Sequence, residues 1–465
     1  MLISKLWPHQ QEALAFMQAR ASAMLAIPMG GGKSRVPLEW LNQETHAGRP
    51  VELVLIACPK SVISVWEAEI KKYLNPALNP LVLPLSDKYG TVIKRTAFLK
   101  MAQDTARNGR NITLFAILNY DVAWREPLAS LLTRTPWGLL IMDESHRLAK
   151  PSGRTSRFFA KLPAKHRVQL TGTPFSHSPL SIYAQFRALA PGFNPYGRTH
   201  EAFKQQYAIM GGYMDRQVVA YKNLADLERK FSTLAYRCTI NLGLPDTLEI
   251  VRTCQLDGEA KKIYKQMEKL FWAEVEQGEV TAANAAVKLL KLQQISGGFV
   301  ITDLGLSRPI ANPAKLTLLQ DLLDDFPLDE PLVIFARFKN DIALIRALCL
   351  DSGRQVCELS GNHNDLAAWQ AGKAPVLIAQ LQAGSLGVDL TRAAYAIYYS
   401  LDFSLANWEQ SKARLHRPGQ TRGVRYIYLI VENTIDEDIL KALQKRQDVI
   451  KSIMEKRGTY ARSVR

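Results

Sequence analysis

The stretch AMLAIPMGGGKS, residues 23–34, decides the fold, because an apolar run leads directly into a Gly-rich loop that ends in Lys33 and Ser34. The backbone N–H groups of such a loop, together with the N-terminus of the following helix, bind phosphate oxygens. A lysine at this place reaches the β- and γ-phosphates of a nucleotide, and a serine hydroxyl suits Mg²⁺. The stretch therefore predicts a strand, a phosphate-binding loop and a helix.

Three consecutive glycines, Gly30, Gly31 and Gly32, let the backbone of this loop approach a phosphate closely. The usual spacing places a further glycine at the position that Ile27 occupies. Taken alone, the loop could also be an ordinary glycine turn ahead of a helix. A second motif is needed to decide between a nucleotide site and a turn.

DESH, residues 143–146, is that second motif, because it follows the apolar run GLLIM at 138–142. We expect Asp143 to hold Mg²⁺ from its outer coordination sphere, and Glu144 to orient and polarise the attacking water. The alternative is a charged pair in a turn at a strand end, which explains neither the apolar run nor the TGTP at 171–174. The two motifs together predict an ATP hydrolase that uses Mg²⁺.

The charge of the chain points to its partner. Lysine and arginine outnumber aspartate and glutamate by 59 to 43, which gives a net charge of +16. An excess of this size favours a polyanion, most simply nucleic acid, and the alternative is a generally basic surface. The last stretch, 441–465, is either a helix with a phosphate-binding face or a solvated tail.

Composition bounds the size and the compartment of the protein. With 465 residues and 47% hydrophobic residues, the chain suits about two or three globular domains. It has no apolar run of the ~18–20 residues that cross a bilayer, and its first residues lack a signal core. The cysteines form no CxxC pair and the histidines no metal-ligand spacing. We therefore expect a cytoplasmic protein with no zinc site and no membrane partner.

Apolar runs alternate with helical patterns over residues 1–175, which indicates a parallel sheet covered on both faces. The expected strands here are 23–27, 53–58, 112–117, 138–142 and 167–172. Between 200 and 300 the pattern is mostly helical. Strand-like runs then return at 332–338, 376–380, 396–401 and 425–431. The predicted fold class is α/β, with two parallel-sheet lobes in tandem and a helical segment between them.

With these motifs placed, the chain resembles the helicase-like ATPases of superfamily two and, within them, the Swi/Snf family of DNA translocases, over nearly its whole length. LWPHQQEAL at 6–14 is similar to the opening motif of the family, which implies that Gln10 contacts the adenine edge. CPKSVISVWEAEI at 58–70 looks like the DNA-tracking motif. The resemblance implies ATP and Mg²⁺ as ligands and DNA as the partner.

Further stretches carry the same resemblance. LTGTP at 170–174 is similar to the coupling motif, in which Thr171 and Thr173 carry the hydroxyls, and His146 is expected to relay closure of the lobes rather than act as a base. Two more stretches favour the Swi/Snf family over a general RNA helicase, LAYRCTINLGLPDTLEIV at 234–251 and LLKLQQISGGF at 289–299.

The second lobe shows the strongest matches, at AGSLGVDLTRA (383–393) and QSKARLHRPGQT (410–421). The resemblance implies nucleotide contacts by Gly387, Asp389 and Gln410. It also implies that Arg414 and Arg417 stabilise charge on the γ-phosphate. Arginine is permanently charged and binds phosphate oxygens through its forked guanidinium. Supplying it from a separate lobe makes hydrolysis depend on lobe closure.

The chain departs from the family pattern at a few positions. Ile27 and Pro28 stand where acidic residues are usual, and Gln382 stands where many members have lysine. These departures bear on nucleotide affinity and DNA coupling rather than on the hydrolytic groups. We expect no long insertions and no histone-reading or zinc domains, as in a minimal motor of bacteria or their viruses.

Candidate nucleic-acid contacts follow the expected parallel strands, at the ends where open α/β sheets bind ligands. They are Lys60, Ser61, Asn119, Tyr120, Arg337 and Lys339. Lys60 could instead be a solvated lysine, and Tyr120 a packed aromatic residue. Because such motors bind mainly phosphates, we expect no strong base preference and a steep loss of binding with salt.

The resemblance implies a RecA-like ATPase lobe at 1–190, a helical segment at 191–310 and a second RecA-like lobe with a basic tail at 311–465. The leading functional hypothesis is an ATP-driven translocase on double-stranded DNA. One alternative is a strand-separating helicase for forks or recombination intermediates. The other is a nucleotide-dependent DNA clamp that recruits a partner protein. A partner could also supply substrate specificity to the translocase.

Overall fold

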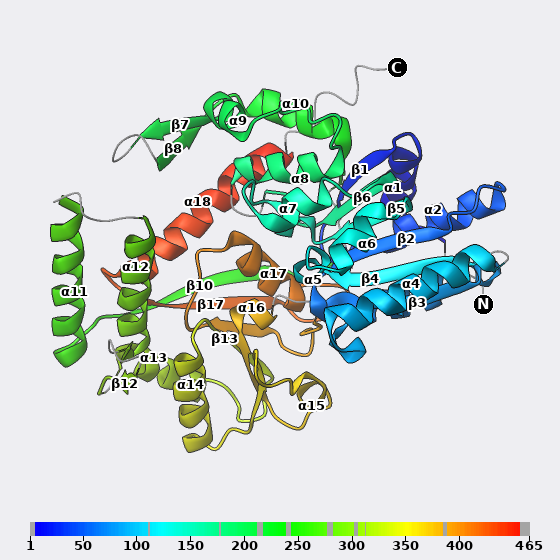
Figure 1. Cartoon of the computed structure of the whole chain (residues 1–465). Helices are drawn as coiled ribbons and strands as arrows, with labels where there is room; N and C mark the ends of the chain where they lie inside the picture. The colour runs from blue at the N-terminus through cyan, green and yellow to red at the C-terminus, as the bar shows by residue number, and fades with distance from the viewer. Residues whose placement is uncertain are drawn as a thin grey trace. The chain divides into compact units, whose positions relative to one another are not determined.

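The computed structural model describes residues 5–109, 112–175, 178–211, 217–238, 243–276, 282–301, 306–311, 313–384 and 388–455. The chain forms two compact units, one made of Met1–Asn241 with Asp448–Arg465, the other of Leu242–Gln447. Each unit is built around one parallel sheet with helices packed on it (Figure 1). The α/β fold class predicted from the sequence is confirmed.

The first unit contains a seven-stranded parallel sheet in the order β3-β4-β2-β5-β6-β1-β9. The strands span β1 Ser22–Ala26, β2 Leu53–Cys58, β3 Pro80–Pro84, β4 Thr113–Asn119, β5 Trp137–Asp143, β6 Ala164–Thr171 and β9 Ala235–Arg237. Every residue of β2 is buried, with Val54 and Ile56 in one core and Leu55 and Ala57 in the other. A strand that is apolar on both faces requires helices on both faces.

Two sets of helices supply those faces (Figure 1). The core that holds Val54 also receives side chains from α1 Pro8–Gln18, α2 Arg35–His46 and α3 Ile63–Tyr73. The core that holds Leu55 receives side chains from α4 Val92–Asn108, α5 Tyr120–Ala123, α6 Leu128–Arg134, α7 Arg154–Phe159 and α8 Ile182–Leu189. The unit continues with α9 His200–Tyr207, the antiparallel pair β7 Ala208–Gly211 and β8 Gln217–Tyr221, and α10 Leu224–Leu234.

The second unit contains a six-stranded parallel sheet in the order β10-β17-β16-β13-β15-β14. The strands span β10 Thr247–Cys254, β13 Leu332–Ala336, β14 Val356–Leu359, β15 Val376–Gln380, β16 Tyr395–Tyr398 and β17 Val424–Val431. The helices are α11 Gly258–Glu276, α12 Ala282–Gly297, α13 Ala314–Asp324, α14 Lys339–Asp351, α15 Leu366–Gln370, α16 Leu381–Gly384, α17 Leu405–Leu415 and α18 Ile435–Glu455. A short antiparallel pair joins β11 Phe299–Ile301 and β12 Ser307–Pro309.

The sequence predicts nine strands of the two parallel sheets but not β3, β9, β10 and β14, nor the short antiparallel pairs β7–β8 and β11–β12. β9 and β10 lie inside the stretch expected to be mostly helical, yet β9 extends the first sheet and β10 the second. β10 forms the end of its sheet and most of its side chains are exposed, so it lacks the continuous apolar run of an internal strand. Within the described residues, no helix has the length and apolar character that a bilayer crossing requires.

A buried ion pair connects three helices of the second unit. The Lys315 ammonium in α13 contacts the carboxylate of Asp436 in α18, and these side chains are only 1% and 3% exposed. Asp436 also accepts hydrogen bonds from the Ser296 hydroxyl of α12 at 3.0 Å and from the backbone N–H of Val431 at 3.4 Å. Each partner is therefore compensated, and removing one leaves a buried charge without its counter-ion.

We predict that Lys315→Met lowers the free energy of unfolding of the second unit by about 3–5 kcal/mol, because Asp436 keeps a buried, unpaired charge. Urea unfolding followed by circular dichroism measures the change. Lys441→Met is the matched control, because Lys441 pairs with Glu437 on the same helix but is 70% exposed. The control should leave the unfolding midpoint nearly unchanged. Equal effects of the two substitutions would contradict a structural role for the buried pair.

Candidate functional site

Three neighbouring strands bring the nucleotide motifs to one edge of the first sheet. β6 lies between β1 and β5, and all three run parallel. Their register pairs Ala26, the last residue of β1, with Thr171, and pairs Asp143 with Leu170. The Gly-rich loop, the carboxylate pair and the TGTP stretch therefore leave the sheet side by side at its carboxyl edge, where α/β proteins bind ligands.

The Gly-rich loop has a backbone that requires glycine. Gly30 and Gly32 have φ angles of 79° and 66°, a region that L side chains rarely adopt. A Cβ on Gly32 would also lie 2.4 Å from the side-chain nitrogen of Gln10. The loop then enters α2 directly after Lys33 and Ser34. This geometry keeps the backbone N–H groups close to any phosphate bound there.

Gln10 fastens the loop to α1. Its amide nitrogen donates to the carbonyl oxygens of Gly31 at 3.3 Å and Gly32 at 3.2 Å, and its oxygen accepts from the backbone N–H of Trp7 at 2.9 Å. His9 adds a bond between its Nε2 and the same Gly31 oxygen at 2.9 Å. In the structure the amide of Gln10 thus supports the phosphate loop, and its contact with adenine remains a prediction.

Ser34 and Asp143 fit a cation site. The Ser34 hydroxyl donates its proton to Glu69 at 2.9 Å, which leaves its oxygen lone pairs available. The two Asp143 oxygens accept single hydrogen bonds, at 2.9 Å from the Trp66 indole and at 2.9 Å from the backbone N–H of Glu144. Hydroxyl and carboxylate oxygens are the ligands that Mg²⁺ prefers.

Groups around Asp143 shift its pKa in opposite directions. Burial is the main cause that raises its pKa to about 6, and repulsion from Glu144 adds to this. The Trp66 hydrogen bond and the positive charge of Lys33 act in the opposite direction. Lys33 is thus close enough to stabilise the anion. A divalent cation at this edge would do the same, because it favours the ionised carboxylate.

Glu144 sits in a strained turn directly after β5. Its φ of 50° lies in the left-handed region, which non-glycine residues seldom adopt. The carboxylate of Glu144 lies 3.3 Å from Nδ1 of His146. The Tyr120 hydroxyl donates to the backbone oxygen of Asp143 at 2.7 Å and supports the end of the strand. These contacts hold the predicted water-activating carboxylate in place.

The TGTP stretch touches the Gly-rich loop. The Thr171 hydroxyl accepts from the backbone N–H of Thr173 at 3.0 Å. A Cβ on Gly172 would lie 3.2 Å from the side chain of Met29, so this turn packs against the segment that enters the loop. Within the described part of the chain, the buried hydroxyl of Thr173 has no hydrogen-bond partner. The placement fits the predicted coupling role, which stays a prediction.

The two matched stretches of the second unit also lie together. The backbone N–H of Leu390 donates to the Arg414 oxygen at 3.1 Å, and the Arg417 guanidinium donates to the Val388 oxygen at 3.4 Å. Asp389 accepts from the backbone N–H and the hydroxyl of Thr391, at 3.0 Å and 2.7 Å. Gln410 is buried in α17. Gly387 lies outside the described residues.

The candidate DNA contacts of the first unit divide into two groups. Lys60 and Ser61 are exposed after β2, and Lys60 forms an ion pair with Asp87. Asn119 caps α5 by accepting from the backbone N–H of Val122 at 3.0 Å. Tyr120 is only 2% exposed, so its ring takes the packing role that the sequence left open as the alternative.

The candidates of the second unit differ in exposure. Lys339 is exposed at the first turn of α14, whereas Arg337 is partly buried between β13 and α14. The Arg337 guanidinium donates to Gln293 of α12 at 2.5 Å.

The sequence does not predict Gln293 as the partner of Arg337, nor the roles of Trp66 and Glu69. Trp66 and Glu69 lie inside the stretch 58–70 that was assigned to DNA tracking, and their contacts with the nucleotide motifs become visible only in three dimensions.

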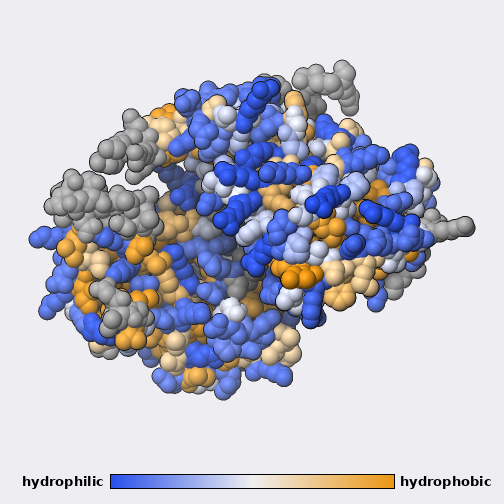
Figure 2. Space-filling view, viewed as in Figure 1, coloured by the Kyte–Doolittle hydropathy of each residue, from blue (hydrophilic) through white to orange (hydrophobic). Residues whose placement is uncertain are grey.

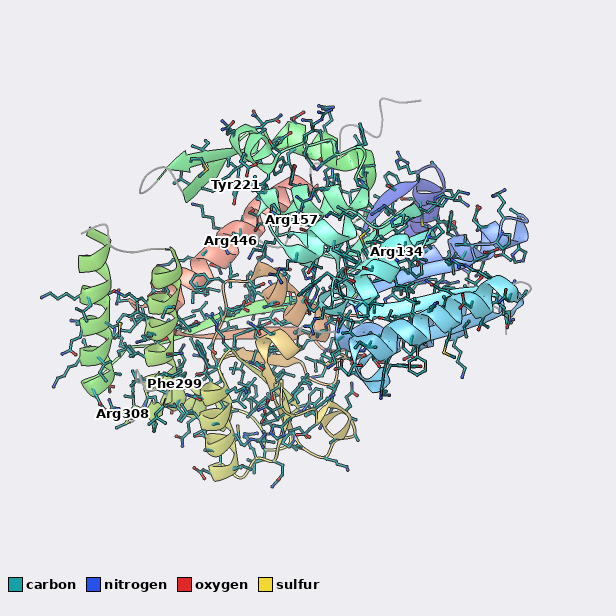
Figure 3. The ribbon with its side chains drawn as sticks, viewed as in Figure 1. Arg134, Arg157, Tyr221, Phe299, Arg308 and Arg446 are labelled. Carbon is teal, nitrogen blue, oxygen red and sulfur yellow. The ribbon has the colours of Figure 1, made fainter. Side chains whose placement is uncertain are left out.

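The first unit carries a basic surface. Hydrophilic residues gather over α6 and α7 on the face seen in Figure 2. Arg134 of α6 and Arg157 of α7 are labelled in Figure 3, and both are exposed. Arg147 and Lys150, which lie between these helices in the sequence, and Arg154, the first residue of α7, are exposed as well. This surface agrees with the polyanionic partner that the net charge predicts.

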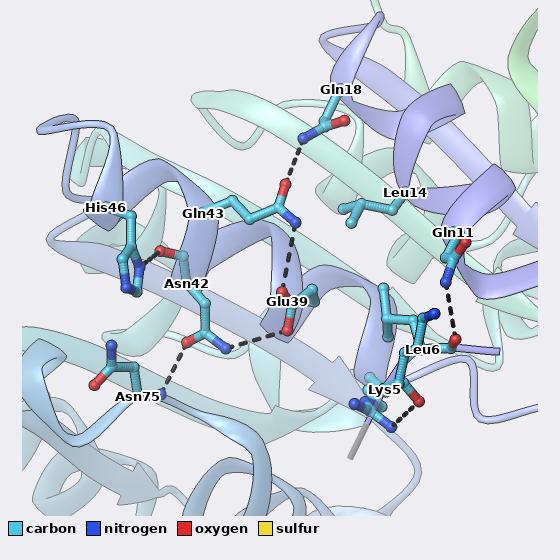
Figure 4. Close-up of a pocket in the computed structure, with 11 residues that line it drawn as sticks. Lys5, Leu6, Gln11, Leu14, Gln18, Glu39, Asn42, Gln43, His46 and Asn75 are labelled. Atoms are coloured by element: carbon cyan, nitrogen blue, oxygen red, sulfur yellow. Dashed lines mark hydrogen bonds between the residues drawn. The ribbon is translucent and has the colours of Figure 1, made fainter. Parts of the chain in front are cut away.

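A polar pocket of about 650 Å³ opens beside α1 and α2 (Figure 4). It is lined by Lys5, Leu6, Gln11, Leu14, Gln18, Arg35, Glu39, Asn42, Gln43, His46 and Asn75. Several of its polar groups bond one another, as in the 2.7 Å contact from Gln18 to Gln43 and the 2.8 Å contact from the Asn75 backbone to Asn42. These bonds connect α1 with α2, and α2 with the segment after α3.

A Gly-rich loop and an Asp-Glu pair on one parallel sheet, followed by a second parallel-sheet unit with paired arginines, define the class of helicase-like ATPases of superfamily two. The SNF2-related domain family matches residues 9–297, and the helicase conserved C-terminal domain family matches residues 314–419. The chain therefore belongs to the SNF2-related family, and the resemblance noted in the sequence is confirmed.

The chain is similar to curated relatives of very different lengths. It is 24% identical to the SWI/SNF chromatin-remodeling complex subunit snf22 of Schizosaccharomyces pombe, over 94% of this chain but 27% of that protein. It is 25% identical to the putative protein p41 of Acyrthosiphon pisum secondary endosymbiont phage 1, over 92% of this chain and 93% of that protein. The Sulfolobus solfataricus SWI2/SNF2 ATPase core in complex with dsDNA aligns at 21% identity and a TM-score of 0.43, over 97% of this chain and 93% of that chain.

We predict that Glu144→Gln lowers the rate of ATP hydrolysis by about 10²–10³-fold while ATP binding survives, because the amide cannot polarise the attacking water. A coupled-enzyme assay measures turnover, and the fluorescence of a labelled ATP analogue measures binding. Glu201→Gln, on the exposed surface of α9, is the control and should match the wild type. Retained turnover in the Glu144 variant would remove this residue from the chemistry.

We predict that Trp66→Phe shifts the acid limb of the pH–rate profile to higher pH. The Trp66 hydrogen bond lowers the pKa of Asp143, which is about 6, so its loss raises that pKa and more alkaline solution is needed to ionise the carboxylate pair. The profile of kcat/KM between pH 5 and pH 8 tests this. Trp137→Phe is the control, because that indole donates to the Leu132 carbonyl instead. A limb that stays in place or moves to lower pH contradicts the prediction.

Proposed function

We propose that the chain is an ATP-driven translocase on double-stranded DNA. The observation that supports this most directly is the placement of the Gly-rich loop, Asp143 and Thr171 at adjoining strand ends of one sheet, in a chain of the SNF2-related family. Such an edge can bind a nucleotide, a cation and a water together. The two relatives named above are a subunit of a chromatin-remodeling complex and a putative phage protein, so the DNA substrate of this chain is itself part of the proposal.

The residues at the edge divide the work of hydrolysis. The loop N–H groups and Lys33 bind the phosphates, and Ser34 and Asp143 hold Mg²⁺. When bound, Mg²⁺ neutralises charge that develops on the phosphate oxygens. Glu144, held by its strained turn and by His146, orients the water for in-line attack. Gln10 keeps the loop in the phosphate-binding conformation, a role that its hydrogen bonds support.

Arg414 and Arg417 of the second unit complete the proposed site when the two units close on ATP. Both belong to a segment that is hydrogen-bonded to the 388–393 stretch. The Arg417 guanidinium has five N–H donors, and the bond to the Val388 oxygen uses one of them. An arginine supplied in this way stabilises the transition state and links turnover to movement.

DNA binding is proposed to run over both units through phosphate contacts. Lys60, Ser61 and Lys339 are exposed at strand ends, and Asn119 and Arg337 lie beside them in their own units. The net charge of +16 and the basic surface around α7 favour a polyanion without base preference. The proposed setting is the inside of a bacterial or phage-infected cell, which the similarity to the phage protein p41 supports. A protein partner would then supply any specificity for one DNA structure.

A strand-separating helicase is the second candidate. Such an enzyme needs a wedge, and the antiparallel pair β7–β8 offers exposed apolar side chains for one, with Ile209 and Val219 exposed by 44% and 54%. A DNA clamp that recruits a partner is the third, and the set of hydrolytic residues argues against it.

Displacement of a third strand distinguishes these functions. We predict that the chain releases a triplex-forming oligonucleotide from a duplex in the presence of ATP and Mg²⁺, because movement along the duplex strips the third strand. A forked duplex of equal length should not be unwound. Glu144→Gln should displace nothing and serves as the control. Fork unwinding without triplex release would favour the helicase, and neither activity with intact DNA binding would favour the clamp.

A further inference from the structure

Asp341, the third residue of α14, is a buried carboxylate that lies in the second unit, apart from the Asp-Glu pair of the first. Its side chain has no exposed surface. One carboxylate oxygen accepts from the Ser400 hydroxyl at 2.5 Å and from the backbone N–H of Phe338 at 3.3 Å. The other oxygen has no hydrogen-bond partner in the part of the chain that the structure describes, and a Cβ on Gly297 would lie 2.8 Å from it.

A chain of hydrogen bonds leads from Asp341 to Arg337. The Ser400 oxygen that donates to Asp341 accepts the backbone N–H of Arg337 at 2.7 Å. The Arg337 guanidinium donates to Gln293 at 2.5 Å, and Gln293 in turn donates to the backbone oxygen of Leu401 at 2.5 Å. The turn between β13 and α14 is therefore held through both its backbone and its arginine side chain.

The guanidinium of Arg337 is held in one orientation, but most of its N–H donors are not directed to Gln293. It lies over the Phe338 ring, with 5.2 Å between its central carbon and the ring centre. Of its five N–H donors, one is directed to Gln293, and the side chain is only partly buried. An arginine that is fixed in this way loses little entropy when it binds a phosphate, which makes its placement important for affinity.

The burial of Asp341 has a thermodynamic cost. Burial raises the pKa of Asp341 to about 7, despite the Ser400 hydrogen bond and the charge of Lys315. The charged groups around it are Lys315 of α13, which is already paired with Asp436 of α18, and Arg337 itself. A buried carboxylate with one unsatisfied oxygen destabilises a fold, so packing alone does not account for this residue.

We propose that Asp341 is a positioning residue for DNA binding: through Ser400 and the cap of α14, it fixes the turn that presents Arg337 to a DNA phosphate. The inference rests on the proposed function, because it assumes that Arg337 contacts DNA. Asp341 itself is buried and is not proposed to touch DNA or nucleotide. Asp341 positions the backbone of Arg337 through Ser400, and Gln293 binds the guanidinium of Arg337.

Fluorescence anisotropy with a labelled 30-base-pair duplex, at one fixed low salt concentration, tests the proposal on the full chain. Asp341→Ala and Ser400→Ala should each weaken duplex binding by about tenfold, the effect of one misplaced charge-assisted hydrogen bond. Asp341→Asn keeps an oxygen acceptor and should restore most of the affinity. Asp351→Asn, exposed at the end of the same helix, is the matched control and should bind like the wild type.

A double-mutant cycle separates positioning from general damage to the fold. In a chain that carries Arg337→Ala, adding Asp341→Ala should weaken binding by less than about twofold, because the side chain that Asp341 places is already gone. An equal tenfold loss with and without Arg337 would overturn the proposal, and so would wild-type binding by both Asp341→Ala and Ser400→Ala. If Asp341→Ala does not fold, Ser400→Ala completes the same cycle. A wild-type chain that binds no duplex would reject the proposed function first, and this inference with it.

Discussion

The parallel register of β1, β6 and β5 is the constraint on which the rest of the site depends. It sets Ala26 beside Thr171 and Asp143 beside Leu170, so three segments far apart in sequence leave the sheet at one edge. Because these strands are buried on both faces, a shift in register by one residue would turn each side chain from the core that it fits into the other core. The two hydrophobic cores therefore fix the distance between the phosphate loop and the carboxylates.

Around that edge, the polar contacts mainly position the phosphate loop and the carboxylates and contribute less to the stability of the fold. Gln10 holds the loop, Trp66 and Tyr120 hold Asp143, and Glu144 is kept in a strained turn. Burial and repulsion raise the pKa of Asp143, and perturbed pKa values of this kind are common at functional sites. In the second unit the buried carboxylate of Asp341 has a similar positioning role. It accepts the Ser400 hydroxyl, which in turn accepts the backbone N–H of Arg337.

The sequence predicts most of the fold because the internal strands are continuous apolar runs, as at Leu53–Cys58, and because the loop and DESH motifs are local. It does not predict β10, whose exposed side chains are typical of an edge strand that only its pairing with β17 defines. It also does not predict the contact of Trp66 with Asp143, since the two residues are 77 positions apart. Contacts of this kind depend on packing, and no local pattern encodes them.

The central proposal is that nucleotide hydrolysis at the edge of the first sheet depends on duplex DNA. Steady-state ATP hydrolysis, measured without nucleic acid and with duplex DNA, single-stranded DNA or RNA at one fixed low salt, tests this claim most directly. We predict strong stimulation by duplex DNA that falls steeply as salt is raised. Stimulation mainly by single strands, or equal turnover under all four conditions, would contradict it.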